Sequence, residues 1–167
     1  MEYSKRIELN PNDAEAYYGR GNAYVHKVDS DHAIRDFTKA VELNPKDARA
    51  YYGMGFAYQL KEDTDKALAN LNKAIEVKPD YGEAYNNRGE VYLYNRDYDR
   101  AISDFTKAIE LKPACGIASP YCGRGQAFEA KGNYDQAIED FKKVIKLEPD
   151  NGVAKSYLVD ALSKKRK

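Results

Sequence analysis

The sequence predicts an all-α fold in which pairs of antiparallel helices repeat along the chain. Two observations carry this prediction. Rows of tyrosine, glycine, alanine and phenylalanine recur every 34 residues, and the prolines keep the same interval before a single step of 36 residues. A repeat of this length is typical of arrays in which each unit is one supersecondary motif. The prolines of the series are Pro11, Pro45, Pro79, Pro113 and Pro149.

Six rows of similar residues run through the four copies of the repeat, with one residue of each row in each copy. A two-residue insertion before the fourth copy explains the single step of 36 residues. The rows are Tyr17, Tyr51, Tyr85 and Tyr121; Gly21, Gly55, Gly89 and Gly125; Tyr24, Tyr58, Tyr92 and Phe128; Ala33, Ala67, Ala101 and Ala137; Phe37, Leu71, Phe105 and Phe141; and Ala40, Ala74, Ala108 and Val144.

The second copy shows why one repeat contains two helices. Tyr51, Gly55 and Tyr58 recur at i, i+4 and i+7, which is one stripe of a helix. A polar break at 61–63 follows, and a second stripe then runs from Ala67 until Pro79 ends the helix. The chain as a whole should form nine helices of about 12–14 residues after a short N-terminal one, with no strands.

The small residues of each repeat predict close contact between its two helices. Gly55 and Ala67 lie where the helices must approach, and Tyr51 and Tyr58 fill the space beside them. A single repeat cannot bury its apolar stripe alone, so neighbouring repeats must stack. We interpret nine tyrosines as packing residues of this kind: Tyr17, Tyr24, Tyr51, Tyr58, Tyr85, Tyr92, Tyr98, Tyr121 and Tyr134.

The pattern Tyr-x-x-x-Gly-x-x-Tyr, followed by Ala-x-x-x-Phe-x-x-Ala and Pro, resembles the tetratricopeptide repeat (TPR). The resemblance implies a right-handed superhelical solenoid of antiparallel helix pairs. Its expected parts are a partial preceding repeat at 1–13, TPR 1 at 14–47, TPR 2 at 48–81, TPR 3 at 82–115, an insertion at 116–117, TPR 4 at 118–151, and a capping helix with a basic tail at 152–167.

Several local features complete the expected fold. Arg20, Arg88 and Arg124 stand where the family often has leucine, and we expect their stems to pack along the helix with their heads in water. Ser30 is expected to cap the helix that begins near residue 31. Ser119, followed by Pro120, should cap the first helix of the fourth repeat.

Composition argues against several classes of protein. The 167 residues contain 27 Lys and Arg against 27 Asp and Glu, so the basic excess of a nucleic-acid binder is absent. The mean hydropathy is −0.80, and no stretch approaches the roughly 20 apolar residues of a membrane span. The N-terminus lacks the apolar core of a signal peptide, and we expect a cytoplasmic protein. The basic run 164–167 fits a helix end that opposes the helix dipole.

The sequence holds few residues that could serve in catalysis or bind a metal. Two cysteines, Cys115 and Cys122, and two histidines, His26 and His32, supply neither a disulfide framework nor a zinc site. The Gly53-Met54-Gly55 run lies inside a predicted helix, where repeat packing explains it better than phosphate binding does. We therefore expect no catalysis, no cofactor and no metal.

The resemblance implies that first helices line a concave groove that holds a peptide or helix of another protein. The side chains that it places there include an aromatic ladder flanked by amides, which suits peptide recognition. The alternative is that these are tolerated surface residues. The predicted site residues are Tyr18, Asn22, Arg49, Tyr52, Phe56, Gln59, Asn86, Glu90, Cys122 and Gln126. Glu15, Glu83 and Glu129 also map to the groove, and we expect it to be acidic in its later repeats.

Family members that grip the C-terminal carboxylate of chaperones use Lys, Asn and Arg at defined places. Only Asn22 matches them in one register and only Asn87 in the next, so a buried carboxylate would lack charged partners. Two functions remain from the sequence. The first is a non-catalytic adaptor or scaffold that binds another protein, with no role for nucleic acid or membrane. The second is a spacer segment of a larger protein, or a module that associates with itself.

Overall fold

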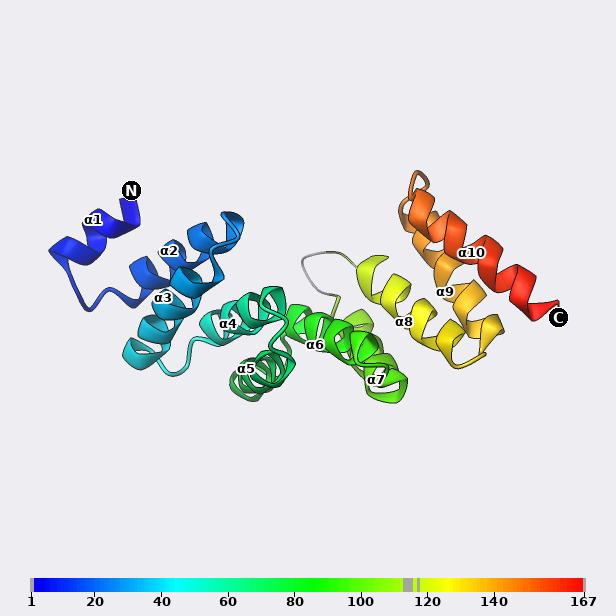
Figure 1. Cartoon of the computed structure of the whole chain (residues 1–167), viewed down its shortest axis with the longest axis horizontal. Helices are drawn as coiled ribbons and strands as arrows, with labels where there is room; N and C mark the ends of the chain where they lie inside the picture. The colour runs from blue at the N-terminus through cyan, green and yellow to red at the C-terminus, as the bar shows by residue number, and fades with distance from the viewer. Residues whose placement is uncertain (1, 113–115, 117, 167) are drawn as a thin grey trace. The chain divides into compact units, whose positions relative to one another are not determined.

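The computed structural model describes residues 2–112, 116 and 118–166, and within them it is all helix and turn (Figure 1). A short α1 (Glu2–Leu9) precedes nine helices of 13 or 14 residues, which confirms the predicted fold class. These are α2 (Ala14–His26), α3 (Ser30–Leu43), α4 (Ala48–Leu60), α5 (Thr64–Val77), α6 (Gly82–Tyr94), α7 (Tyr98–Leu111), α8 (Ala118–Ala130), α9 (Tyr134–Leu147) and α10 (Gly152–Lys165).

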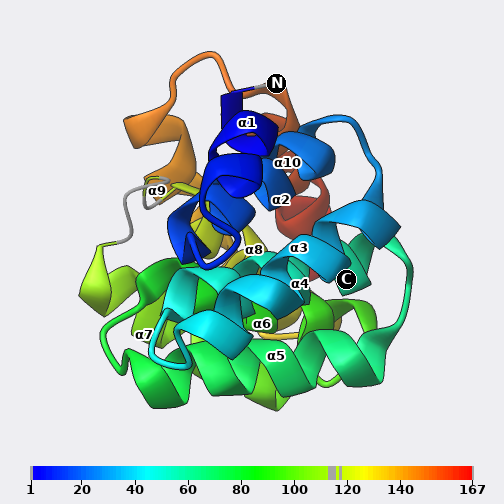
Figure 2. The same cartoon turned by 90° about the vertical axis from the view of Figure 1, so that its left-hand side faces the viewer.

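The helices form two compact units, Met1–Asp80 (unit 1, α1–α5) and Tyr81–Lys167 (unit 2, α6–α10). In unit 1, α2 packs on α3 and α4 packs on both α3 and α5 (Figure 1 and Figure 2). In unit 2, α6 pairs with α7, α8 packs on α7 and α9, and α10 packs on α9. We call α2, α4, α6 and α8 first helices, and α3, α5, α7 and α9 second helices.

Aspartates cap the N-termini of five helices: α2, α3, α4, α5 and α7. Asp63 and Asp97, for example, accept hydrogen bonds from backbone N–H groups three residues later, which satisfies donors that the first turn leaves open. Asp29 performs this role for α3 by accepting from the His32 N–H, and Ser30 is the first residue of the helix. The expected Ser30 cap is therefore wrong, because the neighbouring carboxylate is the better placed acceptor. Such caps fix where these helices begin.

The turn inside each helix pair uses one residue with positive φ. This residue is Val28, Glu62 and Arg96 in the first three pairs, with φ between 58° and 60°, and Gly132 in the fourth, with φ of 78°. Left-handed backbone costs an ordinary residue about 1–2 kcal/mol and costs glycine little. Three of the four turns therefore hold strained residues where the fourth holds glycine.

The core of each unit is built from aromatic rings inserted between glycines. A Cβ added to Gly21 of α2 would lie 2.7 Å from the Phe37 ring, and one added to Gly53 of α4 would lie 2.6 Å from the same ring. Phe37 is therefore held between two first helices. In unit 2, Phe105 lies in the same way between Gly89 and Gly123. The predicted close approach is confirmed, and a second glycine row takes part in it.

The largest fully buried side chains are Phe37, Phe105, Phe141 and Leu71 rather than the tyrosines. Of the nine tyrosines interpreted as packing residues, Tyr92 is buried and the other eight are half-buried. The expectation that they fill the core was too strong, because eight of them keep part of their surface in contact with water. Tyrosine combines a large apolar ring with a polar tip, so a half-buried position satisfies both parts.

Arginine–aspartate pairs cross from first to second helices, and they correct the expectation for the three arginines. The Arg124 Nε and Nη2 donate to the two carboxylate oxygens of Asp140 at 2.9 and 2.8 Å. Arg20 pairs with Asp36, and Arg88 with Asp104, in the same two-bond geometry. The arginine heads are therefore tied to buried carboxylates and not free in water.

The pair of the fourth repeat also reaches other parts of its unit. The Arg124 Nη1 donates to the Thr106 hydroxyl of α7 at 3.1 Å, and its guanidinium lies 5.4 Å from the centre of the Tyr121 ring. The hydrogen bond to Asp140 raises the pKa of Arg124, so the arginine stays charged at any physiological pH. One arginine thus joins three helices.

The fourth repeat begins differently from its prediction. Ser119 and Pro120 lie inside α8, whose first residue is Ala118, so the expected Ser119 cap is wrong. Cys115 lies outside the described residues, and of the insertion at 116–117 only Gly116 is described. Its φ of +91° is one that favours glycine.

Candidate functional site

The predicted site residues fall into two sets, one in each unit. In unit 1 they lie on α2 and α4, which contact one another directly. In unit 2 they lie on α6 and α8, which are also in contact, and α10 follows beside α8. Each set therefore lies on adjacent first helices, and α10 is added to the second because it packs against α8. We call these the α2/α4 face and the α6/α8/α10 face.

An aromatic and cationic cluster dominates the α2/α4 face. The Arg49 guanidinium lies 4.6 Å from the centre of the Tyr18 ring and also pairs with Asp47 and Glu15. Hydrogen bonds to Asp47 and Glu15 raise the pKa of Arg49. The Tyr18 ring in turn lies 5.9 Å from the buried Phe37 ring, centre to centre. Tyr18 was not among the nine tyrosines interpreted as packing residues, yet its ring packs against the core.

Two further aromatic rings of this face, Tyr52 and Phe56 on α4, are half-buried. Gln59 follows one turn later, and its side-chain Oε1 is buried without a hydrogen-bond partner. The Asn22 side chain makes no hydrogen bond to any described residue. The face thus combines ring surface with amide groups that still have hydrogen-bonding capacity.

The α6/α8/α10 face is polar. The Asn86 Nδ2 donates to the Glu90 Oε1 at 2.9 Å, while the Asn86 Oδ1 is buried without a partner. On α8, the Gln126 Nε2 lies 3.5 Å from the Cys122 Sγ. Burial raises the pKa of the Cys122 thiol, which keeps it protonated and a poor nucleophile at neutral pH. This face offers hydrogen bonds rather than reactive groups.

Glu129 does not contribute the free negative charge that the sequence suggested for the later repeats. Its carboxylate accepts from the Lys164 Nζ of α10 at 2.8 Å, and its side chain is only 10% exposed. Lys164 also pairs with Asp160, and Lys165 pairs with Asp135. Much of the basic end of α10 therefore belongs to ion pairs that hold the helix to its neighbours.

Asn87 is a polar residue of α6 that the site prediction omitted. Its Nδ2 is buried without a partner. A signal was available in the sequence, because Asn87 occupies the row that holds Gly19, Gly53 and Gly123 in the other repeats. An amide at a glycine position is an exception to the packing pattern, and exceptions of this kind mark candidate functional residues.

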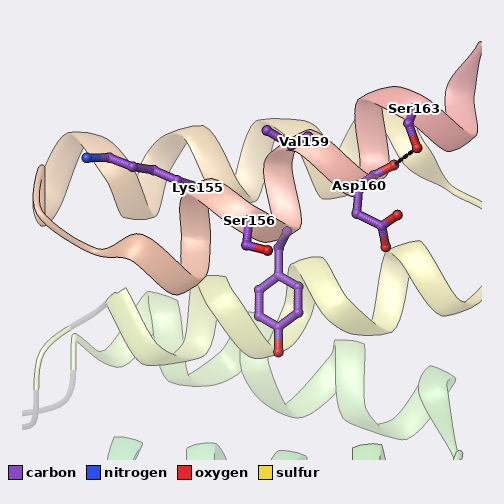
Figure 3. Close-up of a pocket in the computed structure, with 6 residues that line it drawn as sticks. Lys155, Ser156, Val159, Asp160 and Ser163 are labelled. Atoms are coloured by element: carbon purple, nitrogen blue, oxygen red, sulfur yellow. Dashed lines mark hydrogen bonds between the residues drawn. The ribbon is translucent and has the colours of Figure 1, made fainter.

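A shallow pocket of about 680 Å³ lies on α10 alone, lined by Lys155, Ser156, Tyr157, Val159, Asp160 and Ser163 (Figure 3). The Ser163 hydroxyl donates to the Asp160 backbone oxygen at 2.9 Å. A single helix contacts a ligand from one side only, so this pocket is a weaker candidate than the two faces.

The His32 ring has structural contacts of its own. It stacks on the Tyr24 ring and pairs with the Asp29 carboxylate.

The structure also bears on metal binding and on membrane insertion. Among the described residues, no group of three or more His, Cys, Asp or Glu side chains is placed to hold a metal ion. Across the same part of the chain, no helix is long and apolar enough to cross a membrane.

Comparison with known proteins identifies the repeats. The family model described as "Tetratricopeptide repeat" matches residues 14–47, 48–81, 82–115 and 118–151. A search of curated proteins finds no match. Similar solved structures include "Crystal structure of MamA", with 31% identity, a TM-score of 0.78, and coverage of 88% of this chain and 85% of that one.

A second similar structure is "YrrB: a TPR protein with an unusual peptide-binding site". It has 25% identity and a TM-score of 0.82, and the match covers 99% of this chain and 84% of that one. The yeast Tom70 structure, with 24% identity and a TM-score of 0.74, shares the fold over 98% of this chain and 35% of its own. With four consecutive matches to the family model over most of its length, the chain belongs to the tetratricopeptide repeat family.

Proposed function

We propose that this chain is a non-catalytic binding module whose first helices hold a peptide or helix of a partner protein. Repeats of this family generally serve in protein–protein interaction. The observation that carries the proposal is the set of unpartnered amide atoms on first helices, namely Gln59 Oε1, Asn86 Oδ1 and Asn87 Nδ2. Native proteins seldom leave buried polar atoms without a hydrogen bond.

An extended peptide supplies what these amides lack. Its backbone alternates N–H donors and C=O acceptors, and a rotation about the last torsion of an Asn or Gln side chain presents either of its ends. A buried group without a partner costs about 1–3 kcal/mol, which a bound backbone would recover. The half-buried rings of Tyr52 and Phe56 provide apolar contact area beside Gln59 on the same helix.

The resemblance to YrrB supports the same class of ligand, because that protein is described as having an unusual peptide-binding site. It does not fix the residues involved. We propose each face as a binding surface in its own right: the α2/α4 face offers aromatic anchors, and the α6/α8/α10 face offers hydrogen bonds. An affinity in the micromolar range, about −7 to −8 kcal/mol, is expected for a short segment with few anchors.

The decisive experiment compares two double variants in partner capture and in titration of a peptide selected from an array. Tyr52→Ala/Phe56→Ala should weaken peptide binding at least about tenfold, because removing both aromatic anchors should cost at least about 1.4 kcal/mol of binding free energy. Tyr98→Ala/Tyr134→Ala removes two half-buried rings of second helices and serves as the matched control, with binding unchanged. If both variants bind like the wild type, the α2/α4 face is not the binding surface for that peptide. If the wild type captures no partner and selects no peptide, the chain acts as a spacer or a self-associating segment instead.

A further inference from the structure

An exposed ion pair recurs on three of the second helices. A lysine donates to the glutamate three residues later, from Lys39 to Glu42 at 3.0 Å on α3. The same pair joins Lys73 and Glu76 on α5 at 2.7 Å, and Lys107 and Glu110 on α7 at 3.0 Å. Each of these helix faces is locally neutral, because residues three apart lie side by side and their charges cancel.

The fourth second helix breaks this pattern. On α9 the lysine of the pair is Lys143, but the glutamate is replaced by Lys146, and Lys142 adds a third positive charge. All three side chains are exposed, and none forms an ion pair with any described residue. The acidic neighbour one turn earlier, Glu139, is exposed and makes no ion pair with them either. We call Lys142, Lys143 and Lys146 the α9 patch.

Helix electrostatics explains only part of the α9 patch. Lys146 lies in the last turn of α9, where a cation favours the carbonyl end of the helix dipole. Lys142 and Lys143 lie one turn earlier, and the dipole effect falls off within the last turn. Like charges at i and i+4, as in Lys142 and Lys146, instead destabilise a helix slightly. The cluster therefore has a local cost that a bound anion would relieve.

The wider charge distribution agrees with this interpretation. The whole chain is neutral, yet residues 142–167 hold eight Lys and Arg against three Asp and Glu. Several cations of α10 are already paired, as Lys164 and Lys165 are. The α9 patch, in contrast, forms no ion pair within the described part of the chain. Beside it, the Lys143 ammonium lies 6.0 Å from the centre of the Tyr121 ring, which gives the patch an apolar border.

We infer that the α9 patch binds a short acidic segment of a partner protein, separately from the faces of the first helices. Its three ammonium groups come from five consecutive residues, which span about 6 Å of helix axis. That length suits two or three carboxylates of one peptide. The preceding second helix, α7, carries the neutral Lys107–Glu110 pair, so a longer polyanion would meet no continuing row of cations on that helix.

The test uses the repeat pattern itself. Lys146→Glu restores on α9 the Lys–Glu pair that α3, α5 and α7 already carry, so the variant should fold normally. The probe is a labelled short peptide of Asp, Glu and Gly, titrated at low salt by fluorescence anisotropy. Lys146→Glu should weaken its binding about tenfold, or ~1.4 kcal/mol, because one attraction becomes a repulsion. Raising the salt concentration should weaken wild-type binding as well.

Two controls separate this site from the others. Lys46→Glu makes the same charge change at an exposed position of unit 1 and should leave peptide binding unchanged. Tyr52→Ala/Phe56→Ala should also bind the acidic probe normally, so failure of the proposed groove and failure of the α9 patch give different results. Lys142→Gln/Lys143→Gln provides a second loss-of-charge variant if Lys146→Glu does not fold.

Two outcomes would overturn the inference. In the first, the acidic peptide does not bind the wild type at low salt. In the second, it binds Lys146→Glu as tightly as the wild type. In the first case, binding of a single-stranded oligonucleotide or of phosphatidylserine vesicles that Lys146→Glu abolishes would show that the patch serves another class of polyanion.

Discussion

The arginine–aspartate pairs allow a stability prediction in which one repeat is converted into another. Arg124→Met removes the guanidinium that pairs with Asp140, and Arg124→Met/Asp140→Asn removes the pair as a whole. The second repeat already carries this combination, with Met54 and Asn70 in the same rows. Met54 is 6% exposed there, and its sulfur lies 3.6 Å from the Thr38 hydroxyl. Thr106 occupies the corresponding place beside Arg124.

The structure sets the size of the effect. The Asp140 side chain is 6% exposed and that of Arg124 is 20% exposed, so the pair is mostly removed from water. Removing one partner of a buried pair costs about 3–5 kcal/mol, because an unpaired charge remains in the interior. Partial exposure of the arginine reduces this, and we expect Arg124→Met to lower the free energy of unfolding by about 2–4 kcal/mol.

The double variant should recover most of that loss. A neutral amide at position 140 would no longer be a buried charge, and Asn70 shows the available bond, since its Nδ2 donates to the Lys66 backbone oxygen at 2.8 Å. Replacing a buried ion pair by neutral groups of similar volume is often nearly neutral. We expect Arg124→Met/Asp140→Asn to lie within about 1 kcal/mol of the wild type.

Urea unfolding followed by far-UV circular dichroism and by tyrosine fluorescence measures these differences, provided the two transitions coincide. A double variant that is more stable than Arg124→Met alone is the signature of the pair. If the single and the double variant lost the same stability, the pair would not be coupled, and the arginine would contribute through its stem alone.

Two further predictions concern the backbone. Gly89→Leu should lower the free energy of unfolding by at least about 2–3 kcal/mol, because a Cβ at that position lies 2.9 Å from the Phe105 ring. Urea unfolding measures the loss, with Gly152→Ala as the control, because nothing lies within 4 Å of a Cβ there. A Gly89→Leu variant as stable as the wild type would show that the helices are not in close contact. Val28→Gly should raise the free energy of unfolding by up to about 1 kcal/mol, because it places glycine where φ is 59°. Thermal melting should show a higher melting temperature for Val28→Gly and a lower one for Gly132→Val. A lower melting temperature for Val28→Gly would contradict the assigned turn geometry.

Periodicity made most of the fold predictable. Helix positions follow from rows of apolar and small residues, and the row of Gly21 correctly located the close contact between the two helices of a repeat. The cap of α3 was misassigned because Asp29 and Ser30 are adjacent, and both residue types are good caps. Local patterns of this kind determine an element but locate its end only to within a residue or two.

The role of the arginines was missed for a different reason. The prediction considered each first helix alone, and on one helix an arginine beside an apolar stripe normally extends to water. The partner lies 16 residues later, as in Arg20 and Asp36. Three repeats carry both charges, and the second repeat, with Met54 and Asn70, carries neither. That joint presence and joint absence within one chain was the available signal.

The proposed binding faces were the least predictable part, and the reason is physical. The packing residues recur because the two helices of every repeat must fit together in the same way, and this recurrence produces the rows. A ligand is not periodic with the repeat, so we expect its binding residues among those that depart from the rows, such as Asn87 among glycines and Lys146 among glutamates. Sequence periodicity therefore predicts the scaffold, while the exceptions to it indicate where to test for a partner.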